Sequence, residues 1–219
     1  MNLPNELIAA GWLWVAHLVF WPVLALAALR APWHHLRESE SLHVLLGVSV
    51  TVLVLWSVSA RTAEGVSFHL LGATLLTLMF GREFAVLCLT AVLAAATLNG
   101  DGGWLGLPLN ALLTVLAPVG VSSACHTLVC QVLPPNFFVY IFGSAFFSAA
   151  LAMLAAGALS AAVTAVAASA AAPAGGYFPF FVLLAFPEAF VTGMLMTVFV
   201  VYRPQWVSSF SDERYLKGR

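Results

Sequence analysis

Long apolar runs separated by short polar segments dominate this 219-residue chain. A helix needs about 20 apolar residues to cross the hydrocarbon layer of a bilayer. The run 66–98 is interrupted by Gly81-Arg82-Glu83, so it predicts two shorter helices that meet at a charged turn. Prolines at positions 108 and 118 are expected to break another run. The pattern predicts an all-α, polytopic membrane bundle of about seven transmembrane helices, the others covering 7–29, 41–60, 104–132, 137–168 and 178–202.

The composition predicts a membrane protein and excludes several other classes of protein. Hydrophobic residues make up 62% of it, charged residues only 8%, and the mean hydropathy is +1.00. A soluble domain carries about 25% charged residues. The net charge of −1 excludes binding to nucleic acid, which needs a basic patch. We expect one integral membrane domain over residues 1–219, with an outer segment at 1–6 and a cytoplasmic tail at 203–219.

Basic residues predict how the bundle is oriented. With an N-terminus outside and seven helices, Arg61 is the single basic residue on the outer side, and the other seven of the eight Lys and Arg residues lie inside. Cytoplasmic loops carry such an excess of Lys and Arg. We therefore expect a multi-pass protein of the cell inner (plasma) membrane whose C-terminus lies inside. The small residues of 155–174 predict a surface for close helix packing.

Two features at the outer side are candidate metal ligands. His69 stands among small residues just inside the start of an apolar run, and imidazole is the commonest side-chain ligand of transition metals. The alternative is an interfacial histidine satisfied by a neighbouring carbonyl. The Met1 amine, together with nearby amide nitrogens, could chelate Cu²⁺ or Ni²⁺ in tetragonal geometry. The alternative is that Met1-Asn2-Leu3-Pro4-Asn5 merely leads into the first helix.

Two ionisable residues fall within predicted spans. An ionised Glu188 is costly to bury there. Its side chain is therefore expected either to face a polar cavity, with a functional role, or to accept hydrogen bonds from the backbone or Thr192. His17 is expected to make an interhelical contact. Cys125, His126 and Cys130 resemble a metal cluster, but positions five apart lie about 140° apart around a helix, so we interpret them as packing residues.

Nucleotide-binding motifs are absent from the sequence: it has no GxxxxGK[ST] loop and no acidic cluster for Mg²⁺. Nor does any nucleophile stand at a suggestive spacing from a base. We therefore expect that the protein is not an enzyme, and that any ATP hydrolysis belongs to a separate subunit.

Three segments, in the same order, resemble the CbiM family, the membrane substrate-binding components of energy-coupling-factor cobalt and nickel transporters. Residues 65–72, Gly-Val-Ser-Phe-His-Leu-Leu-Gly, resemble that family's G-T-S-x-H-L-x-G. Residues 99–103, Asn-Gly-Asp-Gly-Gly, followed by Asn110, resemble its G-D-G-G with a later Asn. Residues 188–192, Glu-Ala-Phe-Val-Thr, resemble its E-G-x-x-T.

The resemblance implies a ligand set. In that family the metal is held by the N-terminal amine, by the backbone nitrogen and histidine side chain of the second residue, and by a histidine of the third-helix segment. The resemblance assigns Met1 and His69 as metal ligands. It also assigns residues that complete the set of groups around the metal or orient the ligands: Asn2, Ser67, Asp101 and Asn110. Asn2 departs from the pattern, because a neutral amide is a far weaker ligand than imidazole. His17 could replace the lost ligand, another metal or a chelate could bind, or metal transport could have been lost.

The leading hypothesis is a membrane component of an energy-coupling-factor transporter of the ABC type. It would capture Co²⁺ or Ni²⁺, or alternatively Cu²⁺ or Zn²⁺, as cargo rather than as a permanently bound cofactor. Its lid would be the amino terminus and the 99–103 loop, and its partners would be a coupling transmembrane protein and ATP-binding subunits. The alternatives are a non-transporting subunit or assembly factor of a larger complex, and a proton-coupled carrier that uses Glu188 and His17.

Overall fold

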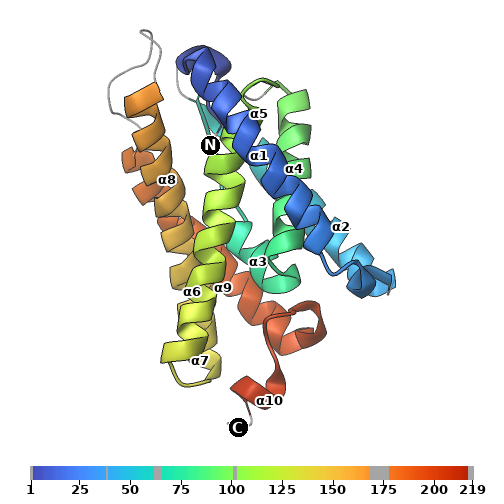
Figure 1. Ribbon diagram of the computed structural model, residues 1–219. Coiled ribbons are helices and arrows are strands. Elements are labelled where there is room, and N and C mark those ends of the chain that lie inside the picture. The colour runs from blue at the N-terminus through green and yellow to red at the C-terminus, as the bar shows by residue number, and fades with distance from the viewer. Residues whose placement is uncertain (1, 38, 62–65, 101–102, 168–177, 217–219) are drawn as a thin grey trace.

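A bundle of tilted helices makes up the computed structural model, which describes residues 2–37, 39–61, 66–100, 103–167 and 178–216 (Figure 1). The α-helices are α1 (Ala10–Arg30), α2 (Ser39–Ser57), α3 (Ala73–Phe80), α4 (Arg82–Leu98), α5 (Leu107–Ala111), α6 (Ala117–Val132), α7 (Phe137–Val139), α8 (Ser148–Ala167), α9 (Phe178–Tyr202) and α10 (Asp212–Tyr215). Short 3-10 turns are η1 (Asn5–Leu7), η2 (Trp33–Arg37) and η5 (Pro204–Trp206).

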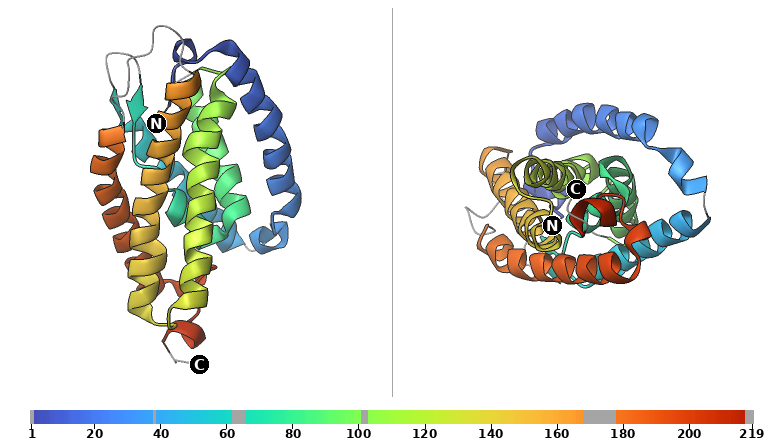
Figure 2. Two further views of the ribbon diagram at one scale, coloured as in Figure 1. Left: turned by 60° about the vertical axis from the view of Figure 1, so that its left-hand side comes forward. Right: turned by 90° about the horizontal axis from the view of Figure 1, so that it is seen from below.

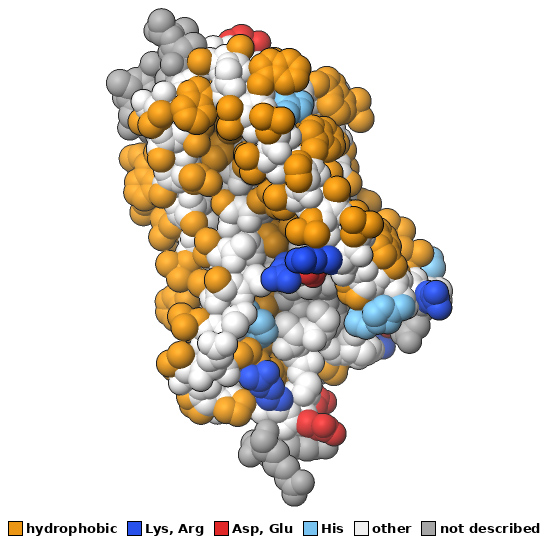
Figure 3. Space-filling model, viewed as in Figure 1, with side chains coloured by type: hydrophobic (Ala, Val, Ile, Leu, Met, Phe, Trp, Pro, Cys, Tyr) orange, Lys and Arg blue, Asp and Glu red, His pale blue; other side chains and the backbone are white. Residues whose placement is uncertain are grey.

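Within the described ranges, five helical runs are long and apolar enough to cross a membrane: 10–30, 39–57, 107–132, 137–167 and 178–202. Their outward faces carry large apolar side chains such as Leu18, Leu29 and Leu183, each more than two-thirds exposed. Side chains of this kind cover most of one face of the molecule (Figure 3). The prediction of an all-α, multi-pass membrane protein is confirmed.

The run 66–98 is divided as the charged turn predicts, but its first residues are not helical. Helices α3 and α4 meet at Gly81. Before them, β2 (Ser67–Phe68) pairs antiparallel with β1 (Ala60–Arg61), and α3 begins only at residue 73. The expectation that His69 lies inside the start of a helix was therefore wrong. With eight residues, α3 is about 12 Å long and too short to cross a bilayer alone.

The expected breaks at the two prolines are not observed. Pro108 lies in the first turn of α5, where its missing N–H costs nothing. Pro118 follows a π-helical stretch, η3 (Leu112–Leu116), which connects α5 to α6 without a gap. A second π-helical stretch, η4 (Tyr140–Phe147), joins α7 to α8 in the same way. Local widening of the helix satisfies the backbone groups that a proline frees in lipid.

Helix α8 packs against α6 and α9, whereas α1 and α2 flank α4 at the other side of the bundle (Figure 2). Gly157 of α8 lies so close to Phe181 of α9 that a methyl group at Gly157 would sit 2.5 Å from the Phe181 Cβ atom. The part of the predicted small-residue surface that belongs to α8 thus lets two helices approach closely. The remainder, from residue 168 to 174, lies outside the described residues.

The C-terminal segment folds back against the bundle instead of extending from it. The backbone N–H groups of Ser208 and Ser209 donate to the carbonyls of Met79 (3.0 Å) and Leu78 (3.2 Å), which end α3. The Tyr140 hydroxyl is 2.7 Å from the Ser209 hydroxyl. Because α3 follows the β2 segment in the chain, it joins that segment to the C-terminal one.

Candidate functional site

His69 lies on the connection between β2 and α3 and is buried, with 3% of its surface exposed. Its Nδ1 atom is 3.0 Å from the Leu70 carbonyl oxygen. Because a carbonyl can only accept, Nδ1 carries the proton, and Nε2 keeps the lone pair that a metal would use. Burial also lowers the pKa of His69 well below its usual value, which favours the neutral ring. The ring lies against Trp56 at a centroid distance of 4.1 Å.

Two helices hold the backbone that follows His69. The Glu188 carboxylate, from α9, accepts hydrogen bonds from the N–H groups of Leu71 (2.8 Å) and Gly72 (2.9 Å). The indole of Trp56, from α2, donates to the Leu71 carbonyl at 3.2 Å. Gly72 has a φ of +67° and leaves no room for a Cβ atom beside Val52. Of the two roles left open for Glu188, hydrogen bonding to the backbone is the one observed, so Glu188 positions the histidine segment.

Asn2 joins the β1–β2 ribbon through Ser67. The Asn2 N–H donates to the Ser67 carbonyl (3.1 Å), and the Ser67 N–H donates to the Asn2 carbonyl (3.3 Å). Directly opposed residues of an antiparallel pair share one face, and so do residues two apart on an extended strand. This register places Asn2 and Ser67 on the same side of the ribbon, and Ser67 lies two residues before His69 in the chain.

Three polar atoms at this pairing are buried without a partner. The Asn2 and Ser67 side chains are each 1% exposed. The Asn2 Oδ1 and Nδ2 atoms and the Ser67 Oγ atom find no hydrogen-bond partner within the described ranges. An unsatisfied buried polar group costs about 1–3 kcal/mol, and folded proteins leave few of them. The ribbon is therefore equipped for an occupant that would satisfy these atoms.

Asn110, on α5, fixes the next residue of the amino-terminal segment. Its Oδ1 accepts from the Leu3 N–H at 2.8 Å, and its Nδ2 donates to the Leu3 carbonyl at 3.1 Å. The side-chain amide thus replaces a neighbouring strand, and residues 2 and 3 are clamped between the ribbon and α5. Sequence reasoning expected Asn110 to orient the ligands or to complete the shell, and its contacts position the amino-terminal segment.

The two segments of the predicted lid, the amino terminus and the 99–103 loop, are in contact where they are described. The Asn5 side chain lies against the backbone of Gly103 and Gly106, so tightly that neither glycine could carry a Cβ atom without displacing it. Gly103 also has a φ of +115°, which favours glycine. Met1 and Asp101, two of the predicted site residues, lie outside the described residues.

His17 does not reach this site, so it cannot replace the missing ligand. Its Nε2 is 3.2 Å from the Leu105 carbonyl, and its Nδ1 accepts a hydrogen bond from the Trp21 indole at 3.0 Å. Both ring nitrogens are therefore occupied. The contact attaches α1 to Leu105, just before α5, and is a contact between segments of the kind expected of His17.

The cysteine–histidine group lies at the opposite end of the bundle. His126 Nδ1 is 3.0 Å from the Ser144 hydroxyl, and Cys130 Sγ is 3.3 Å from the Tyr215 hydroxyl. These contacts fit the packing role that we expected. Within the described part of the chain, no three His, Cys, Asp or Glu side chains converge as a metal cluster requires. A metal at His69 would need backbone, terminal or amide donors as well.

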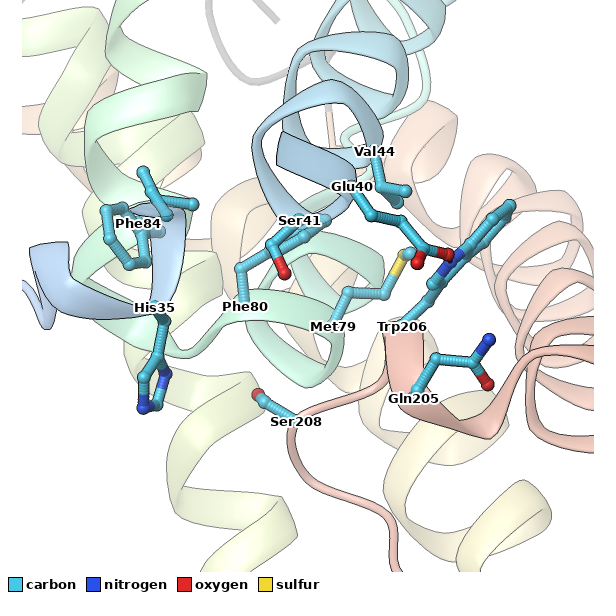
Figure 4. Close-up of a pocket in the computed structure, with 11 residues that line it drawn as sticks. His35, Glu40, Ser41, Val44, Met79, Phe80, Phe84, Gln205, Trp206 and Ser208 are labelled. Atoms are coloured by element: carbon cyan, nitrogen blue, oxygen red, sulfur yellow. Dashed lines mark hydrogen bonds between the residues drawn. The ribbon is translucent and has the colours of Figure 1, made fainter. Parts of the chain in front are cut away.

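A cavity of about 340 Å³ also lies at that opposite end, below the turn between α3 and α4 (Figure 4). The Trp206 indole donates to the Glu40 carboxylate there at 2.7 Å. Met79 and Phe80 make one wall, and His35 lies at its edge. This cavity is separate from the Asn2–Ser67–His69 ribbon.

Comparisons with known proteins agree with this arrangement. The model of the CbiM family, described as the cobalt uptake substrate-specific transmembrane region, matches residues 2–206. Two solved structures are similar: a truncated transition metal transporter (21% identity, TM-score 0.68, 92% of this chain and 98% of that one) and a transition metal transporter (19%, 0.71, 90% and 92%). At such identities the structures support the fold alone. No curated protein matches the chain.

Proposed function

This chain belongs to the CbiM family of cobalt uptake substrate-specific transmembrane regions, and from that premise we propose that it captures a divalent transition-metal ion at the outer end of its bundle. The observation that carries the proposal is that Asn2 Oδ1, Asn2 Nδ2 and Ser67 Oγ are buried and have no hydrogen-bond partner among the described residues. Ser67 lies two residues before His69 in the chain, and Asn2 is paired with Ser67. An ion ligated by His69 and by the Asn2 amide oxygen would give the buried Asn2 Oδ1 atom a partner.

The donor set would combine nitrogen and oxygen. His69 supplies its Nε2 lone pair, Met1 its terminal amine, and Asn2 an amide oxygen where the family pattern has an imidazole. A neutral amide oxygen binds borderline ions such as Co²⁺ and Ni²⁺ less strongly than imidazole does. We therefore propose Co²⁺ or Ni²⁺ as cargo, held more weakly than by a site with two histidines.

Release requires that the clamped amino terminus separate from the ribbon. Asn110 holds Leu3, Ser67 holds Asn2, and Asn5 lies under the lid glycines, so the ion is covered from the outer side. We propose that a coupling transmembrane protein and ATP-binding subunits, acting in the plasma membrane, drive that separation. Among the described residues, α3 follows the ribbon in the chain and is hydrogen-bonded to the C-terminal segment at its other end, so these two elements together could transmit the change.

A non-transporting role in a larger complex is the second candidate. It is favoured by Asn2 itself, because losing an imidazole at that position removes a strong ligand. The two functions differ in whether the purified protein binds metal.

The test uses the full chain in detergent, with an untagged amino terminus and a C-terminal tag. Calorimetric titration with Co²⁺ and Ni²⁺ is expected to show one saturable site, which His69→Ala abolishes. His17→Ala is the matched control and is expected to bind like the parent chain, because His17 is occupied elsewhere. Absence of saturable binding, or loss of binding with both variants alike, would reject metal capture in favour of the non-transporting role.

A further inference from the structure

A groove runs down the surface between α1, α4 and α6, remote from the ribbon that carries His69. Its upper part has a volume of about 250 Å³, and its lower part about 430 Å³. Both parts share Arg82 and Gly120, so they form one continuous depression. Figure 3 shows this face: a basic patch with an acidic side chain beside it separates an apolar surface from a paler, hollowed one.

Both parts of the groove are mainly apolar, but the polar groups on their walls differ. The upper part is walled mainly by aliphatic side chains, which are Val23, Leu26, Val86, Leu116 and Val119. The lower part is lined along one face of α6 by Ser123, Thr127 and Gln131, all at least partly exposed. A ligand that fits both parts must therefore be mainly apolar, with a polar group that these side chains can bind.

Two guanidinium groups mark the boundary between the parts. Arg30 is the last residue of α1 and Arg82 the first residue of α4, and both line the upper part of the groove. Helix α4 has 17 residues and is about 26 Å long, close to the roughly 30 Å of a bilayer's hydrocarbon core. The arginines therefore lie at the depth where lipid phosphates lie.

The charge at this boundary is not fully compensated. Arg82 Nε donates to Glu83 at 2.8 Å, which neutralises one of the two positive charges. Arg30 makes no hydrogen bond or ion pair with the described part of the chain. One net positive charge is left, and guanidinium groups bind phosphate oxygens by paired hydrogen bonds.

We propose that this groove binds an anionic phospholipid. The phosphate would lie between Arg30 and Arg82, the acyl chains along the aliphatic upper part, and the headgroup hydroxyls against Ser123, Thr127 and Gln131. The occupant is a lipid rather than a free anion because the aliphatic wall continues directly from the charged pair. The proposal is independent of the metal site.

The experiment measures lipid binding to the full-length protein. Protein purified in a neutral detergent is mixed with equal amounts of phosphatidylglycerol and phosphatidylcholine, and bound lipids are counted by native mass spectrometry. The parent chain is expected to prefer phosphatidylglycerol. Each of Arg30→Gln and Arg82→Gln is expected to reduce that preference about fivefold, the effect of one basic residue at a lipid surface.

Two further variants separate a local site from a general charge effect. Glu83→Gln raises the net charge of the groove and is expected to increase the preference. Arg203→Gln removes a charge that lies over Trp206, outside the groove, and is expected to leave the preference unchanged. Because Arg30 has no described partner, Arg30→Gln tests the site without disturbing the fold.

Three results would overturn the proposal. The parent chain could bind both lipids equally, or Arg203→Gln could lower the preference as much as Arg30→Gln does. Alternatively, inorganic phosphate at millimolar concentration could displace phosphatidylglycerol, which would make the groove a site for a soluble anion.

Discussion

At the residue scale, Asn2 determines the chemistry of the outer site. Its backbone is fixed by Ser67, and its side chain is buried without a hydrogen-bond partner among the described residues. The backbone geometry thus places whichever side chain stands at position 2 into the site. The choice of side chain then sets the strength of metal binding.

Replacing Asn2 by histidine should therefore tighten the binding of Co²⁺ and Ni²⁺. Imidazole is a better donor for these ions than an amide oxygen, and we expect a gain of at least about tenfold, the scale on which changes around a metal act. The measurement is the dissociation constant of the protein with an untagged amino terminus. Asn2→Ala serves as the control and should bind more weakly than the parent chain. Equal affinity of the histidine variant and the parent would contradict the assignment of position 2.

Glu188 should matter for stability because it accepts two backbone hydrogen bonds. Glu188→Gln keeps the shape but turns an N–H donor toward the N–H of Leu71 or Gly72. We expect a loss of about 1–3 kcal/mol, measured by thermal or denaturant unfolding in detergent, together with weaker metal binding. The matched variant Glu213→Gln lies on the exposed helix α10 and should change stability by less than about 0.5 kcal/mol. Equal unfolding of the two variants would refute the positioning role.

At the element scale, apolar length predicted the helices because lipid imposes a minimum length on a spanning segment. The same criterion failed over 66–72, since an apolar run that is covered by other helices can be extended as easily as helical. The hydrogen bonds that hold the site together could not be predicted from the sequence either. Glu188 bonds Leu71 across 117 positions and Asn110 bonds Leu3 across 107, and no local pattern reports such pairs.

The contact between α8 and α9 yields a prediction of its own. Gly157→Ala places a methyl group 2.5 Å from the Phe181 Cβ atom, so the helices must separate. Overpacking of this kind costs about 1–3 kcal/mol, which is measurable as a lower unfolding midpoint. Gly47→Ala is the control, because nothing lies within 4 Å of a Cβ atom there, and alanine in a helix is expected to stabilise it slightly. A Gly157→Ala protein as stable as the control would disprove tight packing.

At the scale of the whole molecule, the proposed site of metal capture is linked to the C-terminal segment. The ribbon with Asn2, Ser67 and His69 is joined by α3 to the C-terminal segment, whose Ser208 and Ser209 bind the last carbonyls of α3. The basic residues at the C-terminal end predict that this end faces the cytoplasm. A signal from partner subunits could therefore reach the metal site through one short helix.

Orientation can be measured directly with single cysteines. In a chain whose three native cysteines are replaced, Asn99→Cys lies on the predicted outer turn, and Ser211→Cys lies beside α10. Both positions are exposed. A membrane-impermeant maleimide should label Asn99→Cys in intact cells, and Ser211→Cys only after permeabilisation. The reverse pattern would place the amino terminus inside.

The most direct test of metal capture is a crystal structure of the protein with Co²⁺, collected at the cobalt absorption edge. Our account predicts one strong anomalous peak about 2 Å from His69 Nε2, a normal metal–imidazole distance, with the Asn2 oxygen among its neighbours. An anomalous peak only at another place, or none under conditions where the ion is in excess, would contradict it.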